Sequence, residues 1–170
     1  RRTPARARSI WPRARATCVT SDGRGGVWIG TAHGGLAHWQ NGRFTFLKRR
    51  DGLAAEIVHA LLVDHRGDLW IGWEATNCLQ RLSAGKFSTF SQPLGSRTIR
   101  ALAEDAAGQI WAGTFDGYLL RVEGMRLVNE TARTVSPPMP IRCLYAPPDG
   151  GLWIGYAGGG LGWLHDGKFG

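Results

Sequence analysis

The stretch from Ile57 to Phe90 shows how apolar runs alternate with turn residues along this chain. An apolar run covers 57–63, a polar turn follows at 64–67, and a second apolar run covers 68–73. Another turn at 74–77 precedes 78–82, and Ala84-Gly85 leads into 86–90. Short apolar runs bounded by Gly, Asp and Asn are typical of β-strands joined by tight hairpins, in which glycine accepts a positive φ. The pattern therefore predicts four short antiparallel strands in this segment.

The same text recurs around a tryptophan every 41 or 42 residues. The four copies are Val27-Trp28-Ile29-Gly30, Leu69-Trp70-Ile71-Gly72, Ile110-Trp111-Ala112-Gly113 and Leu152-Trp153-Ile154-Gly155. A period of about 40 to 45 residues is that of a propeller blade. Both faces of the tryptophan strand are apolar or glycine, as stacked blades require. We therefore expect Trp28, Trp70, Trp111 and Trp153 to be structural core residues.

The predicted fold is an all-β propeller with four blades of four antiparallel strands each. The expected blades cover 16–48, 57–90, 98–129 and 140–170, the last truncated in its final strand, after an arginine-rich lead-in over 1–15. Four blades of the usual geometry form an open arc with unpaired edges. We therefore expect an arc of a larger propeller of about seven blades. Closure of four blades, or two chains completing one ring, are the alternatives.

Composition and charge narrow the possible partners. The 25 glycines and eight tryptophans suit a turn-rich β protein. No apolar run approaches the roughly 20 residues that cross a bilayer, so we expect no membrane contact by this segment. The net charge of +8 comes from one end, because six arginines and no acid lie in 1–15. We expect a solvated terminal run and no nucleic-acid partner.

Candidate chemistry outside the loops is sparse. The three cysteines, Cys18, Cys78 and Cys143, lack metal-ligand spacing, and the five histidines are scattered over different repeat positions. Cys18 and Cys143 stand where two other repeats have alanine, so we expect small buried thiols there. No nucleophile elbow, P-loop or zinc motif is found, so we expect no catalytic residue, metal or cofactor. The recurring Asp22, Asp64 and Asp105 are expected to form turns.

The repeated text, D-x-x-G-x-[LVI]-W-I-G-T followed by G-G-L and N-G-[RK]-F, resembles the two-component regulator propeller repeat over about residues 10 to 170. That family forms the extracytoplasmic sensor part of bacterial hybrid histidine kinases. The resemblance implies a periplasmic or extracytoplasmic location. It also implies that the remaining blades and downstream signalling domains of a full-length protein, including a histidine kinase, are partners of this segment. The segment itself is not expected to be an enzyme.

The loops between the second and third predicted strands break the repeat. Aromatic residues replace a threonine in two repeats, and carboxylate, imidazole and aromatic groups follow at the next positions. Arginines stand in the loops that link the blades. Aromatic faces beside polar groups suit a sugar, whose C–H face stacks while its hydroxyls form hydrogen bonds. The candidate ligand-binding residues are Trp73, Glu74, His33, Phe115, Asp116, Tyr156, Arg50 and Arg97.

These observations predict a ligand-sensing propeller that recognises an oligosaccharide or other small polar ligand on its loop face. Ligand would favour one packing of the propeller against its downstream domain. In the plainer interpretation, Trp73, Phe115 and Tyr156 only close the core between blades, and the arginines are solvated. A protein-interaction scaffold is the alternative function. A propeller-type lyase or glycosidase is a further one, and would need His33 or Asp116.

Overall fold

The computed structural model describes residues 15–76, 78–91, 97–133 and 138–170. Blade 1 consists of β1 (Arg15–Ser21), β2 (Val27–Ala32), β3 (Leu36–Gln40) and β4 (Arg43–Leu47). Blade 2 consists of β5 (Val58–Val63), β6 (Leu69–Trp73), β7 (Cys78–Ser83) and β8 (Lys86–Ser91). Blade 3 consists of β9 (Ile99–Glu104), β10 (Ile110–Thr114), β11 (Leu119–Glu123) and β12 (Arg126–Asn129). Blade 4 consists of β13 (Ile141–Tyr145), β14 (Leu152–Tyr156), β15 (Leu161–His165) and β16 (Lys168–Phe169).

The predicted all-β propeller fold is confirmed, and the four strands expected between 57 and 90 are present with ends shifted by at most one residue. Two short 3-10 turns, η1 (Arg49–Asp51) and η2 (Thr131–Arg133), follow blades 1 and 3. None of the helical segments in the described ranges is long and apolar enough to span a membrane. The arginine-rich lead-in expected over 1–15 lies outside the described residues, except for Arg15.

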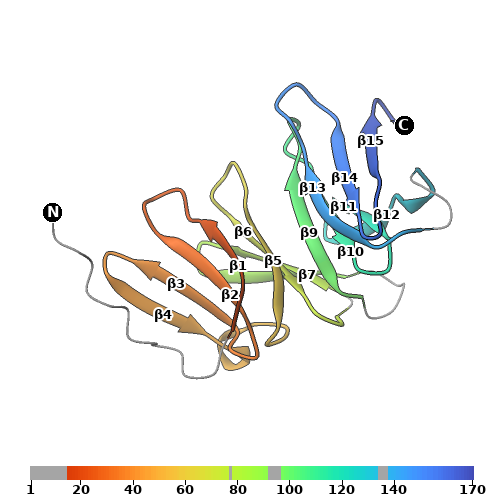
Figure 1. The fold of residues 1–170 in the computed structure, drawn as a ribbon. Coiled ribbons are helices and arrows are strands. Elements are labelled where there is room, and N and C mark those ends of the chain that lie inside the picture. The colour runs from red at the N-terminus through yellow and green to blue at the C-terminus, as the bar shows by residue number, and fades with distance from the viewer. Residues whose placement is uncertain (1–14, 77, 92–96, 134–137) are drawn as a thin grey trace, which may run out of the picture.

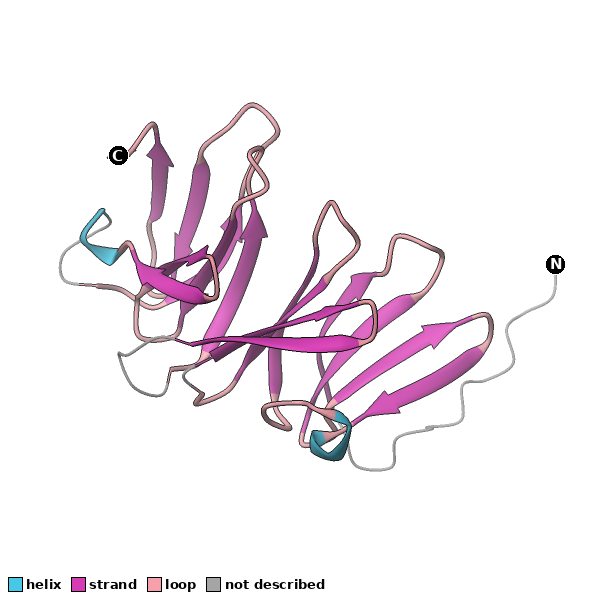
Figure 2. Cartoon of the chain, turned by 180° about the vertical axis from the view of Figure 1, so that it is seen from behind, coloured by secondary structure: helices cyan, strands magenta, loops and turns pink. Residues whose placement is uncertain are grey.

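The blades succeed one another along an arc, with blade 1 at one end of the described structure and blade 4 at the other (Figures 1 and 2). Within each blade the strands pair antiparallel in chain order. The first strands, β1, β5, β9 and β13, contact one another in turn, and we call them the inner strands. Blades 2 and 3 are also joined at their outer edges by one parallel bridge between Ser91 and Arg126, so the two sheets are not fully separate.

Two edges of the blades differ in their connections. The turns that join first to second and third to fourth strands form one edge, which we call the turn face. The loops that join second to third strands, together with the connections between blades, form the opposite edge, which we call the loop face.

Adjacent blades pack by inserting a branched side chain over a glycine. A Cβ added at Gly30 would lie 2.5 Å from Val58 of the next blade, and one at Gly72 would lie 2.7 Å from Ile99. Gly113 repeats the arrangement, with Ile141 at 2.4 Å. Because only glycine allows this approach, the Trp-x-Gly text of each repeat specifies where the next inner strand begins.

Apolar side chains are exposed on the two outward faces of the described arc. At the blade 1 end Val19 is 66% exposed, and at the blade 4 end Leu161 is 66% exposed and Tyr145 61%. Isolated exposed apolar residues are ordinary, but these follow the face that is buried at every internal interface.

The expectation that all four repeat tryptophans are core residues is therefore corrected in part. Trp70 is buried, Trp28 and Trp111 are half-buried, and Trp153 is 36% exposed. Each ring points toward the next blade, and no described blade follows Trp153. The burial of this position depends on the neighbouring blade rather than on the blade that carries the ring.

The recurring aspartates form turns as expected. Asp64 Oδ1 accepts hydrogen bonds from the Arg66 and Asp68 amides, while Oδ2 accepts one from Trp70 Nε1 at 2.8 Å. Asp105 holds Trp111 in the same way. The arrangement ties the first turn of a blade to its tryptophan. The corresponding position in blade 4 is Pro147 rather than an aspartate.

Neither of the two inner-strand cysteines is fully buried, contrary to expectation. Cys18 is half-buried, and burial raises the pKa of its thiol, whereas Cys143 is exposed. The reason is again the open end of the arc, because Cys143 lies beside Gly155 on the face that no described blade covers.

Candidate functional site

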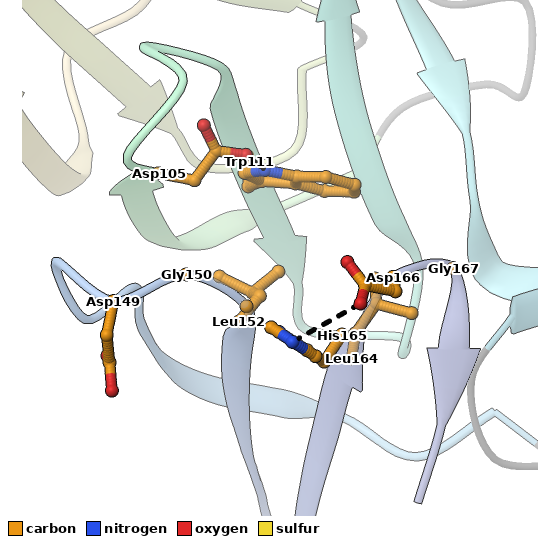
Figure 3. A pocket seen from close by; sticks show the side chains of 10 residues that line it. Asp105, Trp111, Asp149, Gly150, Leu152, Leu164, His165, Asp166 and Gly167 are labelled. Carbon is orange, nitrogen blue, oxygen red and sulfur yellow. Dashed lines mark hydrogen bonds and ion pairs between the residues drawn. The ribbon is translucent and has the colours of Figure 1, made fainter.

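Three clefts between neighbouring blades open on the turn face. Their volumes are about 600 Å³ between blades 1 and 2, 220 Å³ between blades 2 and 3, and 360 Å³ between blades 3 and 4. Figure 3 shows the third, where Asp105 and Trp111 face a rim that includes His165 and Asp166, 3.5 Å apart. Each cleft includes the turn aspartate and the tryptophan of the preceding blade.

The polar residues that line these turn-face clefts belong to the repeated pattern of the blades. In the first of them, Asp22 binds His38 at 2.8 Å, and the His38 ring stacks on Trp28 at 4.0 Å. Burial acts to raise the pKa of Asp22, but hydrogen bonds from the Arg24 amide, His38 and the Gly26 amide outweigh it and hold the pKa below its ordinary value. The polar groups thus have structural partners, and a ligand-specific site is better sought where the repeat is broken.

Two of the aromatic residues expected on the loop face lie in the core instead. Trp73 is fully buried and packs with Ile71 against blade 1, and Tyr156 is 7% exposed and packs with Ile154 against blade 3. A strand has a side-chain period of two, so a residue two positions after a buried isoleucine shares its face. Trp73 and Tyr156 therefore close the core between blades and do not lie where a ligand on the loop face could contact them.

The other aromatic candidate is on the surface and has a cationic partner. Phe115 is 49% exposed, and the guanidinium of Arg100 lies over its ring at 4.8 Å. Its neighbour Asp116 forms an ion pair with Arg97 and accepts a hydrogen bond from Thr114 at 2.7 Å.

Arg97 connects blades 2 and 3 on the loop face. Its backbone pairs with Thr76 of blade 2, and its guanidinium lies 3.7 Å from the centre of the Tyr118 ring and pairs with Asp116. Arg97 and Asp116 are therefore brought together, as a link between blades. His33 and Asp116, one of which the enzymatic alternative needs, have different surroundings, because His33 lines a cleft between blades 1 and 2 and Asp116 is held by Arg97.

The remaining candidates divide between solvent and one cleft. The Arg50 side chain is 82% exposed, with its Nε 3.9 Å from the Asp51 carboxylate. His33 and Glu74 lie together in a loop-face cleft of about 240 Å³ between blades 1 and 2. The full lining is His33, Arg49, Ala55, Glu56, Ile57 and Glu74.

The cleft is polar and carries both signs of charge. His33 stands at φ 70°, in a tight loop where Thr31 Oγ1 accepts a hydrogen bond from the Gly34 amide. On the other wall, Glu74 Oε1 lies 3.5 Å from His59 Nε2. A volume below the roughly 300 Å³ of typical small-molecule sites suits one small group or one unit of a longer ligand.

His59 belongs to a set of residues that the sequence analysis did not single out. Each inner strand contains a β-bulge. In it, one unpaired residue lies between two residues that pair with consecutive residues of the second strand of the blade. A bulge redirects the side chain of its extra residue. The extra residues, which we call the inner-strand bulge residues, are Thr17, His59, Arg100 and Arg142.

A sequence signal for this set exists. In blades 2, 3 and 4 the bulge residue lies between the residue that packs on the glycine of the preceding blade and a small residue, as in Val58-His59-Ala60 and Ile99-Arg100-Ala101. The contacts of His59 with Glu74 and of Arg100 with Phe115 place both side chains next to the first residue of their own loop. The bulges therefore direct polar groups to the loop face.

No cluster of three or more His, Cys, Asp or Glu side chains suited to a metal ion occurs among the described residues. What the loop face carries is hydrogen-bond donors, hydrogen-bond acceptors and charged side chains. Such groups can recognise a polar ligand.

The fold is that of a β-propeller, and the residues on its loop face differ from blade to blade. Residues 93–116 match the family model described as two component regulator propeller. The resemblance inferred from the sequence is thus confirmed by a family match within this part of the chain. The comparison with curated proteins gives no match.

Solved structures agree on the fold. The chain is similar to the extracellular domain of BT3049 from B. thetaiotaomicron, described as a hybrid two component system, with 24% identity and a TM-score of 0.73. It is also similar to virginiamycin B lyase from Staphylococcus aureus, solved with quinupristin, with 16% identity and a TM-score of 0.78. These matches cover 91% and 92% of this chain, but 21% and 55% of the two structures. The chain thus spans about a fifth and about half of their lengths.

Proposed function

We propose that this chain is a ligand-sensing segment of an extracytoplasmic two-component propeller, and that it binds a carbohydrate-like polar ligand in the loop-face cleft between blades 1 and 2. The observation that carries the proposal is the convergence of His33, Arg49, Glu56 and Glu74 in one cleft. These residues differ from their counterparts in the other repeats, whereas the turn-face clefts repeat a common plan.

The cleft has the chemistry that a sugar requires. Carboxylates accept hydrogen bonds from hydroxyls, and imidazole and guanidinium groups donate to ring and hydroxyl oxygens. Trp73 and Tyr156 lie in the core and Phe115 belongs to blade 3, so none of the three candidate aromatic rings lines this cleft. Hydrogen bonding therefore provides most of the specificity, and a small saccharide unit is the expected occupant.

The position of the cleft provides a way to pass on a signal. Its walls come from the loop of blade 1, the connection between blades and the loop of blade 2. A ligand that contacts both walls stabilises the packing of blades 1 and 2 in which both walls can bind it. Such a bias shifts the population of states in proportion to the differential affinity.

The test is binding of the 170-residue chain to an array of defined neutral and acidic oligosaccharides, followed by calorimetry on the best ligand. Glu74→Gln and His33→Ala should each weaken binding about tenfold or more, as expected for loss of a hydrogen bond to a charged group. Glu123→Gln, the same chemical change on the turn face, is the matched control. Binding that is insensitive to Glu74→Gln, or no bound saccharide at all, contradicts the proposal.

A further inference from the structure

The inner-strand bulge of blade 3 carries a cation that the fold does not neutralise. Four arginines in the described part of the chain have half-buried side chains: Arg81, Arg97, Arg100 and Arg121. Three of them lie within ion-pair distance of a carboxylate, namely Asp68, Asp116 and Glu130 respectively. Arg100 has no carboxylate partner among the described residues.

The hydrogen-bonding capacity of Arg100 is also unused. Its Nε is buried and has no hydrogen-bond partner in the described structure, and its one close charge-related contact is the Phe115 ring at 4.8 Å. A cation–π contact stabilises the charge through the face of the guanidinium plane. The five N–H donors point along the edges of that plane and are not satisfied by a ring.

The next blade places a second arginine at the same position. Arg142 is the bulge residue of β13, which lies beside β9, and it is exposed. The nearby acids are already engaged: Glu74 lies beside His59, and Asp116 pairs with Arg97. The loop-face end of the inner strands of blades 3 and 4 is therefore locally cationic, although the chain from Ala16 onward is nearly neutral.

We infer that the bulge arginines Arg100 and Arg142 form an oxyanion-binding site at the loop-face end of the inner strands, which takes a carboxylate, sulfate or phosphate group. Guanidinium groups bind such anions through paired, parallel N–H···O bonds. Phe115 contacts the Arg100 guanidinium at 4.8 Å, and the terminal N–H groups of Arg100 are the donors that the site would use. This inference deepens the proposed function, on which it rests, because it adds an anionic group to the ligand that the loop face would sense.

The experiment follows the arginine Nε–Hε signals of the 170-residue chain by NMR during titration with sodium sulfate, sodium phosphate, sodium glucuronate and neutral glucose. The Arg100 signal is assigned by its loss in Arg100→Gln. We expect saturable shifts of that signal with at least one anion and none with glucose. Sulfate, phosphate and glucuronate are separate arms, so the tightest of them identifies the oxyanion.

Variants distinguish a site from general charge effects. Arg100→Gln should weaken anion binding about tenfold or more, and Arg100→Lys, which keeps the charge but loses the planar fork, should weaken it less. The control Arg43→Gln removes the same charge from an exposed position on β4 and should change nothing. Since Arg100→Gln could affect folding, its circular dichroism spectrum and melting curve are compared with those of Arg43→Gln, and Arg142→Gln provides an independent exposed test.

The outcomes separate this inference from the proposed function. Linear, unsaturated shifts of all arginine signals, or equal weakening by Arg43→Gln, would show only ionic screening and overturn the inference. Neutral saccharides that bind with sensitivity to Glu74→Gln, without any anion effect at Arg100, overturn the inference and leave the proposed function intact. Saturable anion binding that depends on Arg100 but not on Arg43 supports it.

Discussion

The interface between blades 3 and 4 gives a quantitative test of the packing principle. Replacing Gly113 with alanine places a Cβ 2.4 Å from Cγ2 and 3.0 Å from Cβ of Ile141, which is fully buried. The β-branched side chain has little rotamer freedom, so the inner strand β13 must shift. Overpacking costs about 1–3 kcal/mol, and the lower chain entropy of alanine offsets about 0.4–1 kcal/mol. These two ranges leave a net loss of up to about 2.6 kcal/mol, and because the buried Ile141 cannot move aside we expect about 1–2 kcal/mol of it.

The matched control is the same substitution at the end of the arc. At Gly155 the added Cβ meets only Cys143, with Sγ at 2.4 Å, and this exposed thiol can rotate away. Gly155→Ala should therefore change stability by less than about 0.5 kcal/mol. In an Ile141→Ala background the penalty of Gly113→Ala should disappear, because the clashing methyl group is gone. That loss corresponds to a coupling energy of about 1–2 kcal/mol.

The assay is urea unfolding followed by both tryptophan fluorescence and circular dichroism. Each blade contacts only its neighbours, so Gly113→Ala should weaken blade 4 first and make the two signals diverge. For a chain of this length the loss corresponds to a fall in Tm of about 2–8 °C. If Gly113→Ala is as stable as the wild type, or if Gly155→Ala is equally damaging, the principle of a branched residue over glycine is wrong.

Three further predictions concern single side chains. Trp70→Phe should cost about 1–3 kcal/mol, since it removes a buried ring edge and its hydrogen bond, whereas Trp153→Phe should cost less than about 1 kcal/mol; paired urea melts compare them. The pKa of Asp22 is lower in the folded than in the unfolded chain, so its contribution to stability is present above the unfolded pKa and is lost as the pH falls through the folded pKa. Asp22→Asn should therefore make Tm fall less steeply on acidification. An unchanged slope of Tm against pH would contradict this assignment. Cys143, the exposed thiol, should react first with a thiol reagent in the native chain, with the other two cysteines reacting on unfolding; uniform rates would refute the burial assignments.

The fold could be predicted because each repeat presents its complete pattern. Short apolar runs, Asp and Gly turns and a tryptophan at constant spacing specify strand order, and the second repeat shows strand ends within one residue of expectation. The role of the recurring aspartates also followed from their position, since Asp64 and Asp105 form turns and hold the tryptophan indoles. These features depend on residues close together in the chain.

The environment of a side chain was harder to predict where it depends on another blade. Trp153 has the same local sequence as Trp70, yet their exposures differ because only Trp70 is covered by a following blade. Trp73 was assigned to the rim because it replaces a threonine. The period of two along β6 places it on the same face as Ile71, and this information was available in the sequence. Local pattern thus determined the strand, and the neighbouring blade determined its burial.

The candidate sites show why departures from the repeat are informative about function. A residue that recurs from blade to blade, such as the turn aspartate of blades 1, 2 and 3, serves the packing that these blades share. The bulge position has constant backbone geometry but three different residue types over the four blades: Thr17, His59, and then Arg100 and Arg142. Selection for folding alone requires the bulge and not its charge. A half-buried guanidinium without a carboxylate costs stability, so its presence at such a position is best explained by a ligand that supplies the missing anion.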